Sequence, residues 1–355
     1  MDRLACKGVQ NSARSDSIQS TAEQMPAGKK NTGTVRERDY AMDNIRFILI
    51  FLVVFAHLLE LFSGKYKSAM DLYIVIYSFH MPCFLFITGW FARFRLKKLL
   101  RSLVLPYLVF QTLYLLFDYF VLENQENGFS LQYTTPYWLL WYLLAVIFYY
   151  LLLPVLKTQS KKKAAAVIVL LAALSIAAGF VSSIGRWLSL SRAIVFFPFF
   201  MSGYYLSNTF DTMRIRTIFR KYKARLIIFS AAVMAACECF FLKTGIHRSA
   251  FFGSFPYESS GTNAGVRLLI GICAVCAILL LLLIVPNRKL GLLTFIGQNT
   301  MAVYLLHGFI QRLLLKNQVM QFSLQADIEL ALLLTCLILL ALGNKYVGHL
   351  FRKIF

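Results

Sequence analysis

The sequence predicts an all-α polytopic membrane protein with about ten transmembrane helices. Three observations predict this fold class: 59% of the 355 residues are hydrophobic, only 15% are charged, and long apolar runs recur along the chain. A soluble domain has about a quarter of its residues charged. The net charge of +21 would suggest nucleic acid in a soluble protein, but polytopic proteins collect Lys and Arg in their cytoplasmic loops. No nucleic-acid partner is therefore expected.

Two further features of the sequence indicate its domain organisation. Residues 1–38 are polar and lack the apolar core of a signal peptide, so they are predicted to be a disordered basic cytoplasmic tail. Residues 39–355 are predicted to form one membrane domain. Most of the seven cysteines fall inside apolar runs, and Cys273-x-x-Cys276 has no second pair, so no metal site is expected.

The apolar runs give the individual helices. A helix that crosses the ~30 Å hydrocarbon layer needs about 20 apolar residues. The predicted spans are 44–62, 72–91, 103–122, 136–156, 164–182, 190–207, 225–242, 265–285, 295–315 and 326–346.

Positive charge alternates between the connections of these spans. The odd-numbered connections with the adjoining span ends hold nine Lys and Arg residues, whereas the even-numbered connections with their span ends and the C-terminal tail hold twenty, and the N-terminal tail adds seven. Because cytoplasmic loops are enriched in Lys and Arg, both termini are predicted to be cytoplasmic. The predicted location is the cell membrane.

Several ionisable residues lie within the apolar spans. Arg46 lies just inside the first span, where it either snorkels to the headgroups or faces protein. His57 follows eleven residues later, ~16 Å along a helix, and Glu60 lies one turn beyond it. His80 in the second span and His307 in the ninth are expected at a similar depth. Such a group is either a buried hydrogen-bond network or a catalytic site, and the residues alone leave both open.

Other polar or aromatic residues in the spans have simpler interpretations. Pro82 is expected to kink the second span beside His80, because proline donates no amide hydrogen bond. Glu238 lies in the middle of the seventh span and is expected to be protonated, paired or facing a cavity. Trp138 and Trp141 begin the fourth span and match an interfacial aromatic belt.

Six motifs together resemble the integral-membrane acyltransferases called acyltransferase type 3. The motifs are Arg46 with His57; Phe79-His80-Met81-Pro82 with Thr88-Gly89; Arg101 with Pro106-Tyr107; Trp138-Leu139-Leu140-Trp141-Tyr142; Phe197-Pro198-Phe199-Phe200-Met201-Ser202-Gly203-Tyr204; and Ile296-Gly297-Gln298-Asn299-Thr300 with Tyr304 and His307. The segment from Arg38 to His57 looks most like the fucose 4-O-acetylase-like branch.

The resemblance implies a membrane O-acyltransferase that moves an acetyl group from cytoplasmic acetyl-CoA to a sugar hydroxyl of a cell-surface or lipid-linked glycan. Acyl-CoA is then a donor substrate, and no permanently bound cofactor is implied. His57, His80 and Arg46 match the family's functional positions, with Arg101 a weaker match. His57 would act as base or nucleophile, His80 would orient it or stabilise an oxyanion, and Arg46 would hold donor charge.

The donor's phosphates require positive charge at the cytoplasmic face. The cluster that follows the second span is the predicted donor site, made of Arg93, Arg95, Lys97, Lys98 and Arg101. A second cluster runs from Arg214 to Arg225, and either cluster could also serve topology alone.

Two other function classes stay open from the sequence. The main alternative is a transporter for a small solute or sugar conjugate, in which the same His and Arg residues and Glu238 line a translocation path. The other is a non-catalytic membrane partner for glycan assembly. The expected partners are the lipid bilayer, acyl-CoA, the glycan acceptor and possible glycan-assembly proteins.

Overall fold

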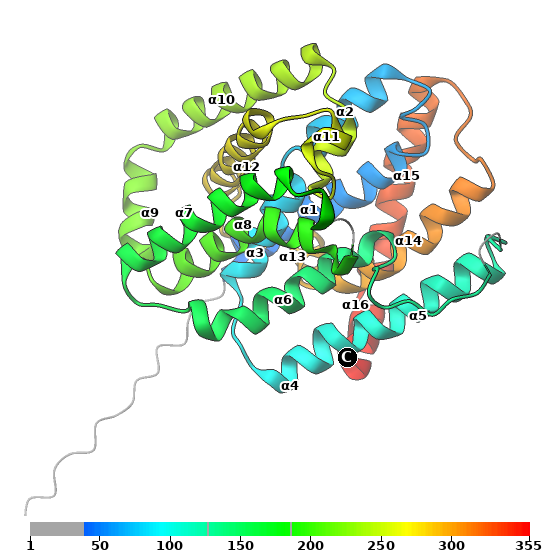
Figure 1. Cartoon of the computed structure of the whole chain (residues 1–355), viewed down its shortest axis with the longest axis horizontal. Coiled ribbons are helices and arrows are strands. Elements are labelled where there is room, and N and C mark those ends of the chain that lie inside the picture. Colours follow the sequence, from blue (N-terminus) through cyan, green and yellow to red (C-terminus); the bar gives the residue numbers. More distant parts are fainter. Residues whose placement is uncertain (1–38, 126–127, 185–186) are drawn as a thin grey trace, which may run out of the picture. The chain divides into compact units, whose positions relative to one another are not determined.

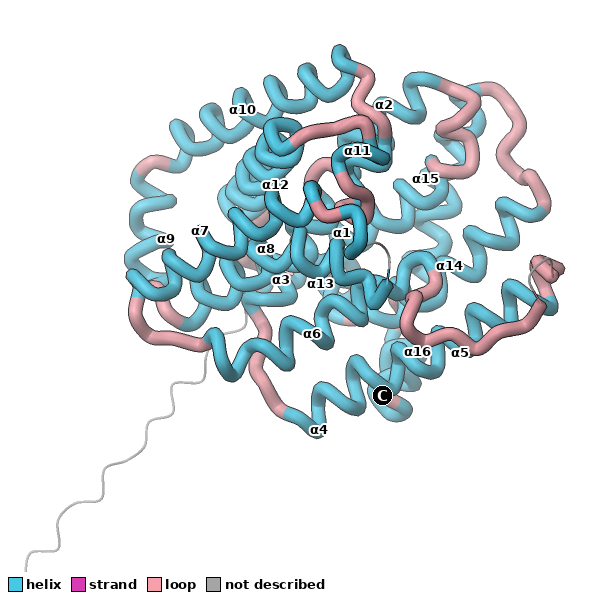
Figure 2. Tube along the Cα trace, in the orientation of Figure 1, coloured by secondary structure: helices cyan, strands magenta, loops and turns pink. Residues whose placement is uncertain are grey.

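The computed structural model describes residues 39–125, 128–184 and 187–355, and every regular element in these ranges is a helix (Figure 2). The predicted all-α fold class is therefore confirmed. The predicted disordered tail, residues 1–38, lies outside the described residues.

Helices lie at all ten predicted positions. The corresponding elements, in chain order, are α1 (Tyr40–Leu59); α2 (Lys67–Tyr77) with α3 (His80–Trp90); α4 (Leu96–Leu99), η1 (Leu100–Val104) and α5 (Leu105–Phe120); η2 (Trp138–Leu140) with α6 (Trp141–Leu156); α7 (Lys161–Ala177); α8 (Leu190–Asn208); α10 (Lys223–Thr244); α12 (Ala264–Ile284); α13 (Leu292–Gln298) with α14 (Thr300–Lys316); and α15 (Leu324–Leu342).

Shorter helices fill the connections. They are η3 (Ala178–Phe180), η4 (Ser182–Ile184), η5 (Trp187–Ser189), α9 (Thr212–Lys221), η6 (Arg248–Phe252), α11 (Tyr257–Ser260) and α16 (Lys345–Ile354). Two of them, α9 and α16, have basic residues on one side and apolar residues on the other, a pattern typical of helices that lie along a membrane surface.

Within the described residues, eight helical segments are long and apolar enough to cross a membrane, so the chain is a polytopic membrane protein. The other two predicted spans fall on α8 and α14. The α8 helix contains Arg192 and Pro198, which lower its apolar character, and α14 has 17 residues. These two are also the helices that contribute Arg192 and His307 to the site described below.

The helices differ sharply in burial. In the most apolar stretch of α1, 67% of residues are buried, against 22% in α7 and in α10. Figure 1 shows α1, α3, α8 and α13 near the middle of the described domain, with α5 and α10 at its periphery. Because the peripheral helices expose apolar side chains such as Leu170 and Ile228, they present a surface suited to lipid.

The break between α2 and α3 has a local cause. Pro82 has no N–H for the carbonyl of Ser78, and its ring clashes with that carbonyl, so the helix is interrupted at Ser78 and Phe79. The predicted kink is thus present and lies one turn before the proline. It places His80 at the first position of a new helix.

Two glycines allow α3 and α8 to cross at close range. A Cβ atom added at Gly89 would collide with the backbone carbonyl of Phe200, and one added at Gly203 would collide with that of Phe86. The backbones therefore touch at two points, as small residues permit in membrane helices. This crossing fixes the helix that begins at His80 against the helix that carries Arg192.

The start of α1 is held by hydrogen bonds from one side chain. The Asn44 amide donates to the carbonyl oxygens of Pro286 and Arg288, each at 3.0 Å, and its Oδ1 accepts from Thr294 Oγ1 at 2.6 Å. A Cβ atom at Gly297 would collide with the Asp43 carbonyl, so α13 packs directly on α1. These contacts fix the position of α1, and with it Arg46 and His57.

Candidate active site

A cavity of about 150 Å³ lies at the C-terminal end of α1. Its walls bring together side chains from α1, α2, α3, η2, α6, α8, η6 and α14. They are Val53, His57, Glu60, Tyr73, Tyr77, His80, Met81, Trp138, Leu139, Trp141, Arg192, Phe196, Phe251, Phe252 and Tyr304. We call this the histidine cavity. It contains two of the three predicted catalytic residues, His57 and His80.

His57 is surrounded by aromatic rings and one carboxylate. Its ring packs edge-on against Trp138 at 4.5 Å between centroids and stacks on His307 at 5.4 Å. Its Nδ1 lies 3.6 Å from Glu60 Oε2 and 3.4 Å from the Tyr77 hydroxyl. With both groups on the Nδ1 side, Nε2 is the nitrogen available to a substrate.

Glu60 follows the last residue of the α1 span. Burial alone would raise the pKa of the Glu60 carboxyl, but the imidazole of His57 and the guanidinium groups of Arg248 and Arg312 lower it, and the net pKa lies below the ordinary value. Glu60 is therefore ionised at neutral pH. An ionised carboxylate beside Nδ1 favours the tautomer with the proton on Nδ1, which leaves a lone pair on Nε2.

His80 and His307 share one hydrogen-bond pattern. Nδ1 of His80 lies 2.8 Å from the Ile76 carbonyl oxygen, and Nδ1 of His307 lies 2.9 Å from that of Val303. A carbonyl oxygen only accepts, so both imidazoles carry a proton on Nδ1 and, when neutral, a lone pair on Nε2. Neutral His80 can therefore accept a proton, and it can stabilise an oxyanion only once protonated.

A second cavity, of about 250 Å³, lies toward the N-terminal end of α1. Its lining is more polar on one side, with Arg46, Thr88, Lys98, Tyr142 and Gln298. We call this the arginine cavity. Tyr304 lines both cavities, and its hydroxyl donates to the carbonyl oxygen of Leu139. The two cavities therefore meet at one side chain.

Arg46, the third predicted catalytic residue, lies in the arginine cavity and not beside the histidines. Its guanidinium stands over the Phe91 ring at 4.1 Å from the centroid, and Nη1 lies 3.6 Å from Asp43 Oδ1. These contacts pair the guanidinium with protein groups, while a quarter of the Arg46 side chain remains exposed.

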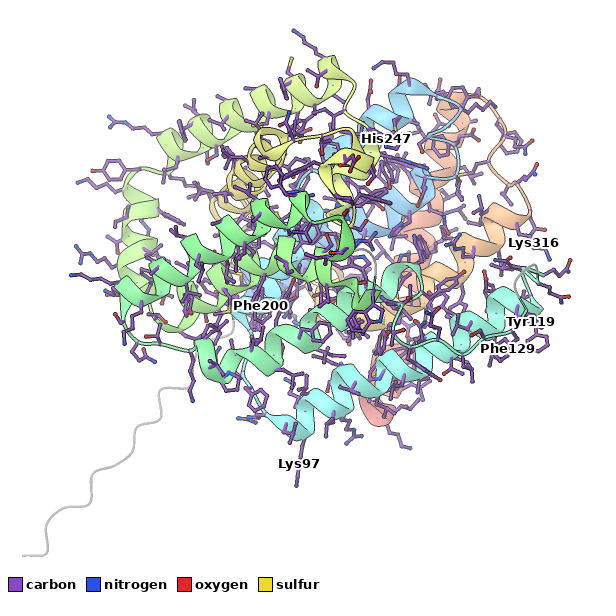
Figure 3. The ribbon with its side chains drawn as sticks, in the orientation of Figure 1. Lys97, Tyr119, Phe129, Phe200, His247 and Lys316 are labelled. Carbon is purple, nitrogen blue, oxygen red and sulfur yellow. The ribbon has the colours of Figure 1, made fainter. Side chains whose placement is uncertain are left out.

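The five predicted donor-binding residues differ in their contacts. Lys98 lines the arginine cavity. Arg101 donates to the Lys353 carbonyl oxygen at 2.9 Å, and Arg93 donates to that of Ala92 at 2.7 Å. All five residues are exposed, and Figure 3 shows Lys97 projecting away from the ribbon.

Some residues of the site were not among the predicted ones. Arg192 was counted only as a loop charge, yet it lines the histidine cavity with its guanidinium over Trp141 at 5.0 Å. Trp138 and Trp141, interpreted as belt residues, line the same cavity. The Trp138–Tyr142 motif contributed to the family resemblance, but it did not indicate that these residues line a cavity. Glu238 lies outside the cavity and accepts from Ser78 Oγ at 2.5 Å, beside the α2–α3 break.

The family model of an acyltransferase domain, acyltransferase 3, matches residues 39–343 of the sequence. The chain belongs to the acyltransferase 3 family. Comparisons with curated proteins and with solved structures gave no match. Membership makes the chain a membrane acyltransferase and disfavours the transporter and non-catalytic alternatives. The match is to the family as a whole and assigns no branch.

Proposed function

We propose that this acyltransferase moves an acetyl group from cytoplasmic acetyl-CoA to a sugar hydroxyl of a cell-surface or lipid-linked glycan, in the cell membrane. One observation carries the proposal: the arginine cavity and the histidine cavity meet at Tyr304 along the length of α1. Arg46 and His57 are eleven residues apart on this helix, ~16 Å. A thin pantetheine arm could bridge that distance while its nucleotide stays at the surface.

The basic residues support a donor at the Arg46 end. Lys98 lines the arginine cavity, and Arg93, Arg95, Lys97 and Arg101 lie on the same segment. Coenzyme A carries several phosphate charges, so these residues would attract it and hold it. The predicted cytoplasmic position of this segment agrees with the compartment of acyl-CoA.

The histidine cavity supports transfer at the other end. Nε2 of His57 would take the proton of the sugar hydroxyl as its oxygen attacks the thioester carbon. The carbon–sulfur bond then breaks, and the sulfur of CoA receives the proton from His57. Ionised Glu60 would stabilise the imidazolium that forms, and Arg192 would stabilise the oxyanion of the tetrahedral intermediate. The aromatic walls suit a sugar ring.

The test is acetyl transfer by the purified chain. With radiolabelled acetyl-CoA and glycans extracted from the producing cell, wild type should cleave the thioester and label a glycan. His57→Ala should lower transfer by about 10²-fold or more while still binding donor. His349→Ala, which removes an exposed histidine on α16, is the matched control and should remain active. Near-normal transfer by folded His57→Ala would overturn the proposal. Label that stays on denatured protein would indicate an acetyl-histidine intermediate.

The branch of the family and the acceptor sugar need separate support. The segment around Asp39-Tyr40 and Asp43-Asn44 resembles the fucose 4-O-acetylase-like branch, which favours a deoxysugar acceptor. Comparing fucose-containing with fucose-free glycans in the same transfer assay tests this finer proposal.

A further inference from the structure

A third cavity, of about 310 Å³, adjoins the histidine cavity, and Arg192 is the one side chain of its lining that the mechanism above uses. It shares Trp138 and Arg192 with the histidine cavity. Its lining residues are Thr135, Pro136, Tyr137, Trp138, Ser189, Arg192, Ser254 and Arg312. We call it the two-arginine cavity. A molecule bound in it would lie beside Arg192 and Arg312.

Charge is the first argument for what this cavity binds. Among its described lining residues, Arg192 and Arg312 are the charged ones, and none is a carboxylate. Glu60, by contrast, lies in the histidine cavity. In the histidine cavity the ionised Glu60 carboxylate offsets the charge of Arg192, so an anionic group is attracted more strongly to the two-arginine cavity.

The guanidinium groups are held in place by aromatic rings. Arg312 Cζ lies over the Trp138 ring at 4.6 Å, and Arg192 Nη2 donates to Ser254 Oγ at 3.4 Å. Stacking uses the face of a guanidinium and leaves the N–H edge for an acceptor. Arg312 Nε is buried, and no described residue accepts a hydrogen bond from it. Trp138 also contacts His57, so one indole ring separates Arg312 from the reacting nitrogen.

The surrounding backbone is a second, independent argument. Trp138 has φ 30° and Ser189 has φ 51°, a region that non-glycine residues seldom adopt. Such strain is held at functional sites by the surrounding structure. Here the neighbouring Leu188 N–H donates to the Thr134 carbonyl at 2.6 Å and ties the two loops together. The loops thereby form a fixed rim.

The predicted topology gives a third argument. Only nine Lys and Arg residues fall in or beside the connections predicted to be extracytoplasmic, and Arg192 and Arg312 are two of them. Positive charge on that side serves no topological purpose. Two such residues that line one cavity therefore need another reason.

We propose that the two-arginine cavity binds an anionic group of the acceptor, a phosphate or a carboxylate, next to the sugar whose hydroxyl is acetylated at His57. This inference rests on the proposed transfer to a sugar and adds that the acceptor is an acidic or phosphate-linked sugar. The guanidinium forks match either anion in geometry. A neutral sugar lacks the group that both arginines would bind.

Tryptophan fluorescence of the full chain in nanodiscs tests the proposal, since Trp138 and Trp141 lie at the site. The probes are glucose 1-phosphate, glucuronate and neutral glucose, at equal ionic strength. Glucose 1-phosphate, glucuronate or both should change the fluorescence at concentrations where glucose does not. The active probe identifies the source of the anion. Arg312→Gln should weaken its binding about tenfold or more.

Lys316→Gln is the matched control, because it removes one positive charge from the same helix outside the cavity. Lys316 lies at the far end of α14 and donates to Glu123 Oε1 at 2.9 Å (Figure 3). Equal responses to all three probes, or equal weakening by Arg312→Gln and Lys316→Gln, would overturn the proposal. If Arg312→Gln does not fold, Arg312→Lys keeps the charge and loses the fork, and it should still weaken binding several-fold.

The acetyl-transfer assay separates the two proposals. A chain that transfers acetyl to native glycans but binds no anionic probe retains the proposed function and refutes the anion site. A chain that binds the probes but never cleaves acetyl-CoA refutes the proposed function, and the anion site stands by itself.

Discussion

At the scale of single residues, Glu60 is the group whose charge the structure fixes most clearly. Its pKa is lower in the folded chain than the ordinary value of 4.5, because His57, Arg248 and Arg312 outweigh the effect of burial. A lowered pKa contributes stability that is fully present above the ordinary pKa and is lost as pH falls through the folded-state pKa. The ionised carboxylate therefore stabilises the fold at neutral pH.

The variant Glu60→Gln tests this contribution of the ionised carboxylate to stability. The variant should have a lower Tm than wild type between pH 7 and pH 5, and the difference should shrink as pH falls below 4.5. Asp71→Asn, at an exposed pair with Lys67, is the control and should change Tm little. A difference between wild type and Glu60→Gln that grows on acidification would contradict the assigned direction. Acetyl transfer by Glu60→Gln should also fall, since His57 loses its carboxylate.

Two neighbouring lysines allow a sharp test of donor binding. Lys98 lines the arginine cavity, whereas Lys97 is outside its lining and projects away from the ribbon in Figure 3. Lys98→Gln should raise the acetyl-CoA KM several-fold with little change in kcat, because it removes a ground-state phosphate contact. Lys97→Gln is the matched control and should leave KM near the wild-type value. Equal KM effects of the two substitutions would assign the basic segment to topology alone.

Some residues of the site could be predicted from the sequence, and others could not. His57 and His80 were predicted because ionisable residues are costly in apolar spans, and the structure places them in one cavity. Arg192 was not predicted as a site residue, because in the sequence a charge near the end of a span looks the same as a loop charge. Only the packing of α8 on α3 places it in the cavity. Arg46 was grouped with the histidines by depth and motif, but three helical turns separate it from them, so it lines another cavity.

At the scale of helices, the crossing of α3 and α8 is the contact on which the site most depends. Gly89→Ala should place a methyl group against the Phe200 carbonyl, and overpacking of this kind costs about 1–3 kcal/mol. Gly271→Ala in α12 meets open space and is the control, expected to be neutral or slightly stabilising. Thermal unfolding in detergent measures both. Equal Tm values for the two variants would show that the crossing is looser than described.

The positions of the helices were predictable from the lengths of the apolar runs. The positions of the breaks within helices were only partly predictable. The proline of the Phe-His-Met-Pro motif signalled a kink, and the break lies one turn earlier, at the carbonyl that Pro82 leaves without a donor. The division between α13 and α14 at Asn299 had no such signal. At this break Asn299 Nδ2 donates to the Phe295 carbonyl at 2.9 Å, and Asn299 Oδ1 accepts from Arg352 on α16 at 2.7 Å.

At the scale of the whole molecule, we propose that the donor and the acceptor bind at opposite ends of α1. The all-α polytopic class was predictable from composition, and in the described part of the chain eight segments are long and apolar enough to span a membrane. The direction in which they span it remains a prediction from the alternating charge. It decides which compartment supplies each substrate.

The most direct measurement supplies radiolabelled acetyl-CoA, which does not cross membranes, to one face at a time. Inside-out vesicles from producing cells expose the predicted cytoplasmic face, and right-side-out vesicles expose the other. We predict labelled glycan in the lumen of inside-out vesicles, little label with right-side-out vesicles, and none with His57→Ala in either. Equal labelling from both faces, or labelled glycan only on the face that received acetyl-CoA, would contradict a donor at Arg46 and transfer at His57.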